Sequence, residues 1–289
     1  MALDKATWYL GWLGEMRALP TPEVAFTNTE ERFGGVHQGL TGKRVMDITG
    51  YRKTYEMDFR LLSEDDYRWL RSLYLNFVSP PNSLYLIDPM RKNLLSPQAT
   101  LMTGNNGNDL GVTSSVSTIV TAFVNDFPTG VALQGPRSFN LVSTSGTSSF
   151  IRFDGSNTMI PLFAGVPVTL SMYVRCESGT VAFNLVADCF DKYMVQTTTP
   201  SIGQTATTTW QRISYTFTPS GNQVGLRMAL VFPTSGTKNL HIAAPQIEYS
   251  SSATEWDLGG GRSKVLLDQI TSTSPRFPLS DVSVTFLEA

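Results

Sequence analysis

The stretch TYEMDFRL (Thr54–Leu61) has the clearest strand pattern in the 289-residue chain. Its polar and apolar residues alternate with a period of two, which is the repeat of a β-strand with one buried face. The pattern places Tyr55, Met57, Phe59 and Leu61 on that buried face. We therefore expect a β-sheet in the first part of the chain.

A helix from about Glu64 to Leu75 is predicted directly after this strand. Ser63 and Asp66 have the spacing of a capping box, with Asp in place of the usual Glu. Glu64 and Asp65 fit the first turn, because the helix dipole favours negative charge there. Apolar residues at helical spacing predict that the helix packs broadly on the sheet.

The end of the chain, DVSVTFL (Asp281–Leu287), is a second alternating strand, with Val282, Val284 and Phe286 predicted to point inward. It follows a triple glycine, Gly259–Gly261, which we interpret as a flexible hinge. The final segment of about 32 residues is too short for a domain of its own. We expect it to return to the first segment and complete that sheet.

Charged residues divide the chain in the same way. Asp, Glu, Lys and Arg number 24 in residues 1–100, 16 in residues 101–257 and 6 in residues 258–289. The poorly charged middle is rich in Ser, Thr, Gly and Asn, and such a change in composition marks a domain boundary. The sequence thus predicts a discontinuous domain, residues 1–100 and 258–289, with an inserted domain of residues 101–257. Such an insertion requires its two ends to lie close together.

The inserted segment carries a series of short β-rich runs between turn signals, with no helical pattern among them. Such a series in about 155 residues predicts an antiparallel sandwich of the jelly-roll type. The predicted fold class is therefore mainly β, with a split β-rich domain that contains one helix and an inserted jelly-roll β-sandwich. The runs are Phe139–Val142, Phe150–Phe153, Val168–Val174, Thr180–Leu185, Arg212–Phe217, Val224–Leu230 and Leu240–Ala243.

The net charge of −2, without long blocks of like charge, argues against direct binding to nucleic acid or to an anionic membrane. No apolar run approaches the ~18 residues of a membrane span, and the first residues lack a secretory leader pattern. We expect a soluble protein that is made in a cytoplasm. The cysteines, Cys176 and Cys189, have neither zinc-site spacing nor the pattern of a disulfide framework, and both are expected to be buried.

Catalytic chemistry has little support in the sequence. The only histidines, His37 and His241, have no catalytic partner near them in the sequence, and His241 is expected to be a satisfied or surface histidine. The stretch Gly35–Lys43 lacks the first glycine and the final Ser or Thr of a phosphate-binding loop, so we interpret it as a hairpin or bulge. No two acids have a spacing that indicates glycoside hydrolysis. We expect no enzyme activity and no catalytic residues.

The loop before the sandwich is a candidate calcium-binding site. Asn105, Asn106, Asn108 and Asp109 supply oxygen ligands in a flexible segment, as calcium requires. The same residues also form turns, which explains them equally well. They are the only metal-ligand candidates, and no cofactor is expected.

Aromatic residues are frequent in and beside the predicted sandwich strands. Sugar rings stack their C–H faces on exposed aromatic side chains, and their hydroxyls need amide, carboxylate or guanidinium groups nearby. Tyr193, which lies between Lys192 and Gln196, and Trp210 are the candidate glycan-binding residues. Tyr215 and Phe217 share a strand parity and are expected in the core.

The runs WQRISYTFTPS (Trp210–Ser220), LRM (Leu226–Met228), APQIE (Ala244–Glu248) and ATEW (Ala253–Trp256) resemble the carbohydrate-binding-module-like jelly rolls of phage tail and tail-fibre proteins. This resemblance covers about half the chain. It implies the fold of the inserted domain and leaves open whether the domain binds a sugar.

The flanking segments resemble the belt domain of phage distal tail proteins. The resemblance rests on a strand-then-helix unit (Tyr51–Leu75), a strand at Leu84–Asp88 and the closing strand at Val282–Leu287. It implies a homo-hexameric ring in the virion that joins the tail tube to the tail-tip hub or baseplate, and a sandwich that contacts other tail proteins or host surface glycans. The alternatives are a glycan-binding adhesin module without a ring and, remotely, a glycoside-active enzyme.

Overall fold

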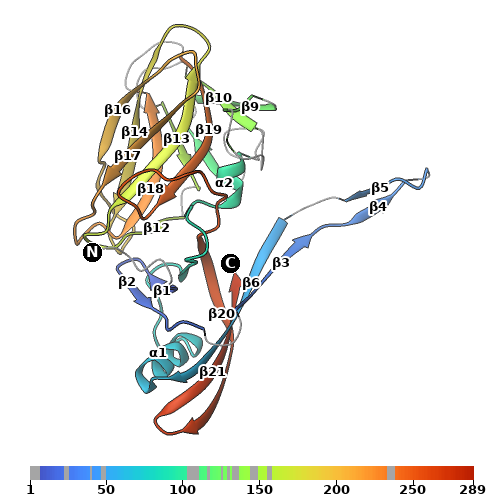
Figure 1. Cartoon of the computed structure of the whole chain (residues 1–289), viewed down its shortest axis with the longest axis vertical. Coiled ribbons are helices and arrows are strands. Elements are labelled where there is room, and N and C mark those ends of the chain that lie inside the picture. Colours follow the sequence, from blue (N-terminus) through green and yellow to red (C-terminus); the bar gives the residue numbers. More distant parts are fainter. Residues whose placement is uncertain are drawn as a thin grey trace.

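The computed structural model describes residues 7–22, 26–39, 41–46, 50–102, 111–115, 118–124, 126–128, 131, 137–143, 149–154, 158–232 and 238–289. Figure 1 shows a β-sandwich at one end, a second sheet with a helix at the other, and a long two-stranded arm that projects from the second sheet. The chain is mainly β, as predicted. Neither of the helices in this described part is long and apolar enough to cross a membrane.

The second sheet, called the basal sheet below, has seven strands in the order β2-β1-β7-β20-β21-β6-β3. β20 pairs with β7, and β21 pairs with β6, both antiparallel. The last two strands of the chain therefore lie in the middle of a sheet that the first segment begins. The strands are β1 (Tyr9–Trp12), β2 (Glu15–Ala18), β3 (Phe26–Phe33), β6 (Gly50–Leu62), β7 (Tyr85–Ile87), β20 (Arg262–Arg276) and β21 (Leu279–Glu288).

The alternation in β6 is confirmed for Tyr55, Met57 and Phe59, which are buried. It is wrong for Leu61, which is 53% exposed, while Leu62 beside it is buried. Leu61 has a φ of 54°, and the pairing with β21 shifts by one residue at this end of the strand. This β-bulge reverses the faces of the last two residues, which alternation alone does not reveal. On β21 the inward side chains are the predicted Val282, Val284 and Phe286.

Helix α1 (Glu64–Tyr74) follows β6 as predicted. The Ser63 hydroxyl accepts a hydrogen bond from the backbone N–H of Asp66 at 3.2 Å, which satisfies one of the free amides at the helix start. Trp69, Leu70 and Leu73 are buried, and they join the same hydrophobic cluster as the inward side chains of β6 and β21. The helix thus covers one face of the basal sheet.

The sandwich consists of two antiparallel sheets. The front sheet has the order β17-β13-β19-β10-β9, and the back sheet has the order β15-β14-β18-β11-β8, with β12 and β16 paired to β18 and β14. Its strands are β8 (Val112–Ser114), β9 (Thr118–Val124), β10 (Arg137–Ser143), β11 (Ser149–Phe153), β12 (Ile160–Pro161), β13 (Val168–Cys176), β14 (Val181–Phe190), β15 (Gln196–Thr198), β16 (Ser201–Ala206), β17 (Gln211–Phe217), β18 (Gly225–Phe232) and β19 (Lys238–Glu248).

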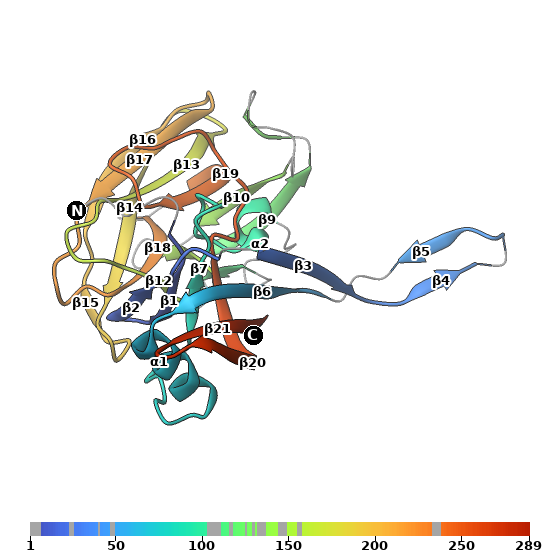
Figure 2. The ribbon, with the colours of Figure 1, turned by 60° about the horizontal axis from the view of Figure 1, so that its bottom comes forward.

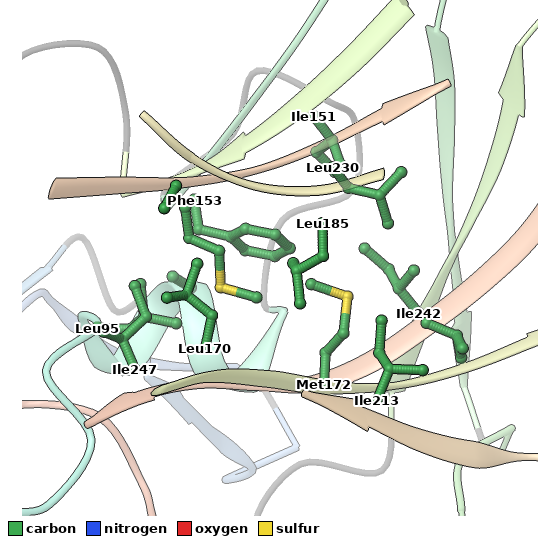
Figure 3. Close-up of a cluster of buried hydrophobic side chains, with 14 of the residues drawn as sticks. Leu95, Ile151, Phe153, Leu170, Met172, Leu185, Ile213, Leu230, Ile242 and Ile247 are labelled. Carbon is green, nitrogen blue, oxygen red and sulfur yellow. The ribbon is translucent and has the colours of Figure 1, made fainter. Parts of the chain in front are cut away.

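The sandwich core lies between the two sheets. Figure 3 shows Phe153 and Leu185 of the back sheet facing Leu170 and Met172 of the front sheet. Leu95, which precedes the first sandwich strand, enters the same core (Figure 3). The predicted jelly-roll-type sandwich contains all seven predicted runs, as β10, β11, β13, β14, β17, β18 and β19. It also contains five short strands that were not predicted from the sequence, β8, β9, β12, β15 and β16.

A second, short helix, α2 (Pro97–Leu101), is present in addition to the one helix that the sequence predicts. Ser96 caps it by accepting a hydrogen bond from the Ala99 N–H. Ala99 and Met102 pack into the sandwich core. The chain therefore begins to contribute to the sandwich several residues before residue 101.

The triple glycine is not a flexible hinge, which corrects that expectation. Gly259, Gly260 and Gly261 are all buried. The Gly260 N–H donates to the Leu95 carbonyl at 2.7 Å, and the Gly261 N–H donates to the Asn93 carbonyl at 2.9 Å. At Gly259 and Gly261 a side chain would collide with the neighbouring backbone, and Gly260 has a φ of 114°, which favours glycine.

Asn93 joins the two connections between the basal sheet and the sandwich. Its side-chain amide donates to the carbonyls of Pro245 and Asp257, and its Oδ1 accepts from the N–H groups of Leu95 and Ile247. The incoming and outgoing chain segments therefore lie side by side, as an inserted domain requires. We retain the division into residues 1–100 with 258–289 and residues 101–257 as a proposal.

Candidate functional site

The outer face of the front sheet carries a group of polar and aromatic side chains, and it is called the polar face below. Successive residues of a strand point to opposite sides, so β13 directs Val174 into the core and Tyr173 and Arg175 outward. Strand pairing sets Arg212 of β17 beside Tyr173, and His241 of β19 beside Arg175. These residues come from distant parts of the sequence.

His241 is the centre of one end of the polar face and is only 1% exposed. Its Nδ1 lies 2.8 Å from Asp126 Oδ2, and its Nε2 lies 3.3 Å from Glu177 Oε1. Arg175 also binds Asp126, with Nη2 at 2.8 Å and Nε at 3.3 Å. The sequence predicts either a satisfied or a surface histidine at this position, and His241 is the satisfied one. Its carboxylate partners lie 115 and 64 positions away, which is why the sequence does not reveal them.

Trp210 lies directly before β17 and is half-buried beside this cluster. The Arg175 guanidinium carbon is 5.5 Å from the centre of the indole ring, and the His241 ring meets the indole edge-on at 6.5 Å between centroids. Cation–π and aromatic contacts of this kind fix the orientation of a ring. Trp210 is thus an ordered aromatic surface beside the Arg175 guanidinium and the His241 ring.

Tyr173 and Arg212 form the adjoining part of the polar face. The Arg212 guanidinium carbon is 5.7 Å from the centre of the Tyr173 ring, and its Nη2 donates to the Ser171 hydroxyl at 3.0 Å. Arg212 has no carboxylate partner within the described part of the chain. Its Nε is buried, so the terminal N–H groups that Ser171 does not use are the ones left for hydroxyl or anionic oxygen acceptors on a ligand.

The other end of the polar face is closed by the chain itself. Glu248 accepts hydrogen bonds from the N–H and the hydroxyl of Thr254, and Gln246 accepts one from the N–H of Asp257. Gln246 and Glu248 are buried as a result. The PQIE and ATEW runs therefore fold a segment back over the sheet, and the open part is the end with Trp210 and Arg212.

Tyr193, the other predicted aromatic platform, lies elsewhere. It is 68% exposed in the turn between β14 and β15, where Lys192 lies over its ring at 5.1 Å. The Asp191 carboxylate orders this turn by accepting from the N–H groups of Tyr193 and Val195. The turn belongs to the back sheet and faces the β1–β2 connection, since Lys192 is next to Gly14. The structure does not bring Tyr193 and Trp210 together.

The remaining candidates have simple positions. His37 is exposed in β4 (Val36–Gln38), which pairs with β5 (Arg44–Met46), so the stretch around it is the predicted hairpin. Cys176 and Cys189 are free and buried. The calcium candidates Asn105, Asn106, Asn108 and Asp109 lie outside the described residues. Within the described ranges, no group of three or more His, Cys, Asp and Glu side chains is arranged to hold a metal ion.

No protein-family profile matches the sequence, and no curated protein matches it either. Solved structures match over about half of the chain. The CBM22-1 xylan-binding domain of Paenibacillus barcinonensis Xyn10C is 13% identical, with a TM-score of 0.37, and the match covers 52% of this chain and 92% of that domain. A CBM61 module in complex with β-1,4-galactotriose is 15% identical, with a TM-score of 0.37, over 55% and 99%.

The enzymatically active domain of tailspike protein 4 from bacteriophage CBA120 is 17% identical, with a TM-score of 0.41. That match covers 55% of this chain and 21% of the tailspike chain, so this chain spans about a fifth of that protein's length. At these identities, similarity concerns the fold and not the ligand.

Proposed function

We propose that this protein binds glycans through the open end of the polar face. The observation that carries the proposal is the arrangement of Trp210 against Arg175 and His241. A half-buried, oriented indole offers a surface for the apolar face of a sugar ring. Arg212, beside Tyr173, supplies a donor for sugar hydroxyls, and the exposed Glu177, beside His241, supplies an acceptor.

We propose a binding role and not a hydrolytic one. A general base must reach the proton that it removes. His241 is 1% exposed, and both of its ring nitrogens already face carboxylates, so it has little capacity left for a substrate. The Asp126–His241–Glu177 group is better suited to hold Trp210 and Arg175 in place.

The test is binding of the full chain to a glycan array, followed by titration with the best glycan. We expect the replacement Trp210→Ala to weaken binding tenfold or more, a change of about 1.4 kcal/mol or more. Tyr193→Ala is the matched control, because Tyr193 is an exposed aromatic residue away from the polar face, and its loss should leave binding unchanged. An array without any bound glycan would remove the proposal, and so would equal binding by both variants.

A second proposal concerns assembly: the protein is a virion component that forms a ring at the tail tip, with the sandwich directed outward. Two features favour it, the free edges of the basal sheet at β2 and β3 and the arm that extends from β3 and β6. Exposed strand edges pair readily with other chains. Electron microscopy of the pure protein tests this role. Closed rings, expected to be hexameric, support it, whereas a glycan-binding particle that stays monomeric favours the adhesin alternative.

A further inference from the structure

The arm consists of the outer halves of β3 and β6 together with β4 and β5. Pairing continues from Phe26 opposite Met57 to Phe33 opposite Gly50, and then from Val36 opposite Met46. Figure 2 shows the arm reaching away from both the sandwich and the basal sheet. Every residue in the ranges 27–39 and 41–44 is exposed.

An arm of this kind is poorly stabilised by itself. A single two-stranded hairpin in water is marginally stable, because it has no third strand or packed face. Phe33 is 42% exposed and Val36 is 63% exposed, so apolar side chains of the arm also remain in water. A partner surface would stabilise both the backbone and these side chains.

The charge at the outer end of the arm is positive. Within residues 33–50 the charged side chains are Lys43, Arg44 and Asp47, which gives a net charge of +1. Both cations are exposed. A complementary surface should therefore be acidic and long enough to accept an extended hairpin.

The basal sheet has such a surface on the face formed by β3, β6, β20 and β21. Two hollows of about 260 and 280 Å³ adjoin there and share Asp58, Thr271 and Ser283. Glu56, Asp58 and Asp281 line them, with Arg60 as the only cation, so the lining has a net charge of −2. The other lining side chains are mostly Ser, Thr and Gln. This surface is called the acidic groove.

We propose that the arm of one copy lies in the acidic groove of a second copy, with Lys43 and Arg44 near Glu56 and Asp58. In Figure 1 the arm continues outward from β3 and β6, away from β20 and β21. The groove of the same copy lies on these four strands, so the arm extends away from it. A second copy is therefore the occupant that the geometry favours. The inference deepens the proposed ring, because it names the two contacting surfaces.

The contact joins different surfaces on the two copies. Heterologous contacts of this kind generate a closed ring when the rotation between copies closes, and an open filament when it does not. The contact between exposed charges should weaken as salt is added, since the Debye length falls from about 10 Å at 0.1 M to about 3 Å at 1 M.

The experiment measures the mass of the full chain by light scattering and mass photometry. We expect the double variant Lys43→Glu/Arg44→Glu to shift the population from the wild-type assembly to the monomer. Arg91→Glu/Lys92→Glu is the matched control, since it reverses two adjacent exposed cations outside the arm and should assemble normally. Equal melting temperatures exclude misfolding as the cause.

A charge exchange completes the test. Glu56→Lys/Asp58→Lys alone should also be monomeric, whereas a mixture with Lys43→Glu/Arg44→Glu should assemble, because each variant has the charge that the other has lost. Wild-type-like assembly of both variants would overturn the arm contact and leave the ring proposal intact. A wild-type protein that stays monomeric at every concentration would overturn both, while glycan binding is measured independently.

Discussion

The guanidinium Nη2 of Arg262 lies 2.5 Å from Asp154 Oδ2, and both side chains are buried. Arg262 begins β20 of the basal sheet, and Asp154 follows β11 of the sandwich. Asp154 also accepts hydrogen bonds from the N–H of Ser96. The pair therefore links the two parts of the molecule at the place where the chain passes between them.

The first prediction is that Asp154→Asn lowers the free energy of unfolding by about 3–5 kcal/mol, because it leaves a buried guanidinium without a counter-charge. Asn tolerates the left-handed backbone of residue 154, where φ is 68°, so the effect isolates the charge. Urea unfolding followed by tryptophan fluorescence measures the change.

The exposed pair Arg68–Glu64 on α1 provides the control for this prediction. Arg68→Ala should cost less than about 1 kcal/mol, as surface ion pairs do. An equally small effect of Asp154→Asn would mean that water reaches Arg262 and that the pair does not link the two parts.

The second prediction concerns Asn93, which is fully buried. Asn93→Ala removes hydrogen bonds to Pro245, Asp257, Leu95 and Ile247 and leaves those backbone groups without partners. A buried group without its partner costs about 1–3 kcal/mol, so a loss of at least 3 kcal/mol is expected in total. Limited proteolysis should then show new cleavage near residues 257–262, where the outgoing segment depends on Asn93. Wild-type resistance to cleavage there would contradict this role.

Local patterns in the sequence were sufficient to predict most of the elements. The alternation in β6 and β21 and the cap of α1 depend on residues within a few positions, and each is found in the structure. The exception is the end of β6. The Leu61 N–H donates to the Asp281 carboxylate at 2.9 Å, a contact across two strands that turns Leu61 outward. Such a bulge depends on the partner strand, so a single-strand pattern cannot reveal it.

The candidate site was predictable only in part. Trp210 was identified by residue type, but its neighbours Arg175 and His241 are brought to it by the pairing of β13 with β17 and β19. The alternation around β19 does indicate that His241 points away from the core. Its contact with Asp126 depends on a loop over 100 residues earlier, which spacing does not reveal.

The third prediction concerns the buried thiol of Cys189. Burial raises its pKa to about 11, so at pH 8 the group is protonated as well as shielded. In a Cys176→Ser background we expect no reaction with Ellman's reagent until the protein unfolds. Ser251→Cys in the same background is the control, because residue 251 is exposed and its thiol should react at once.

The raised pKa of Cys189 also predicts how the free energy of unfolding changes with pH. The folded state keeps the Cys189 proton more tightly than the unfolded chain, whose thiol has a pKa near 9. The contribution of this group is therefore complete below pH 9 and is lost as the pH rises through about 11. Urea unfolding of the wild type and of Cys189→Ala at pH 8 and pH 10.5 measures this contribution. The difference in unfolding free energy between the two proteins should be smaller at pH 10.5. A stability difference between the two proteins that does not change with pH would contradict the raised pKa.

The fourth prediction distinguishes a packed Gly259 from a flexible one. A Cβ at this position would lie 2.4 Å from the Leu95 carbonyl oxygen and 2.6 Å from that of Ser96, so Gly259→Ala must displace the backbone. We expect it to lower the free energy of unfolding by about 1–3 kcal/mol, as overpacking does. Gly221→Ala is the matched control, because a Cβ there has no neighbour within 4 Å. If residues 259–261 acted as a hinge, both variants would be as stable as the wild type or slightly more stable, because alanine reduces the freedom of the unfolded chain.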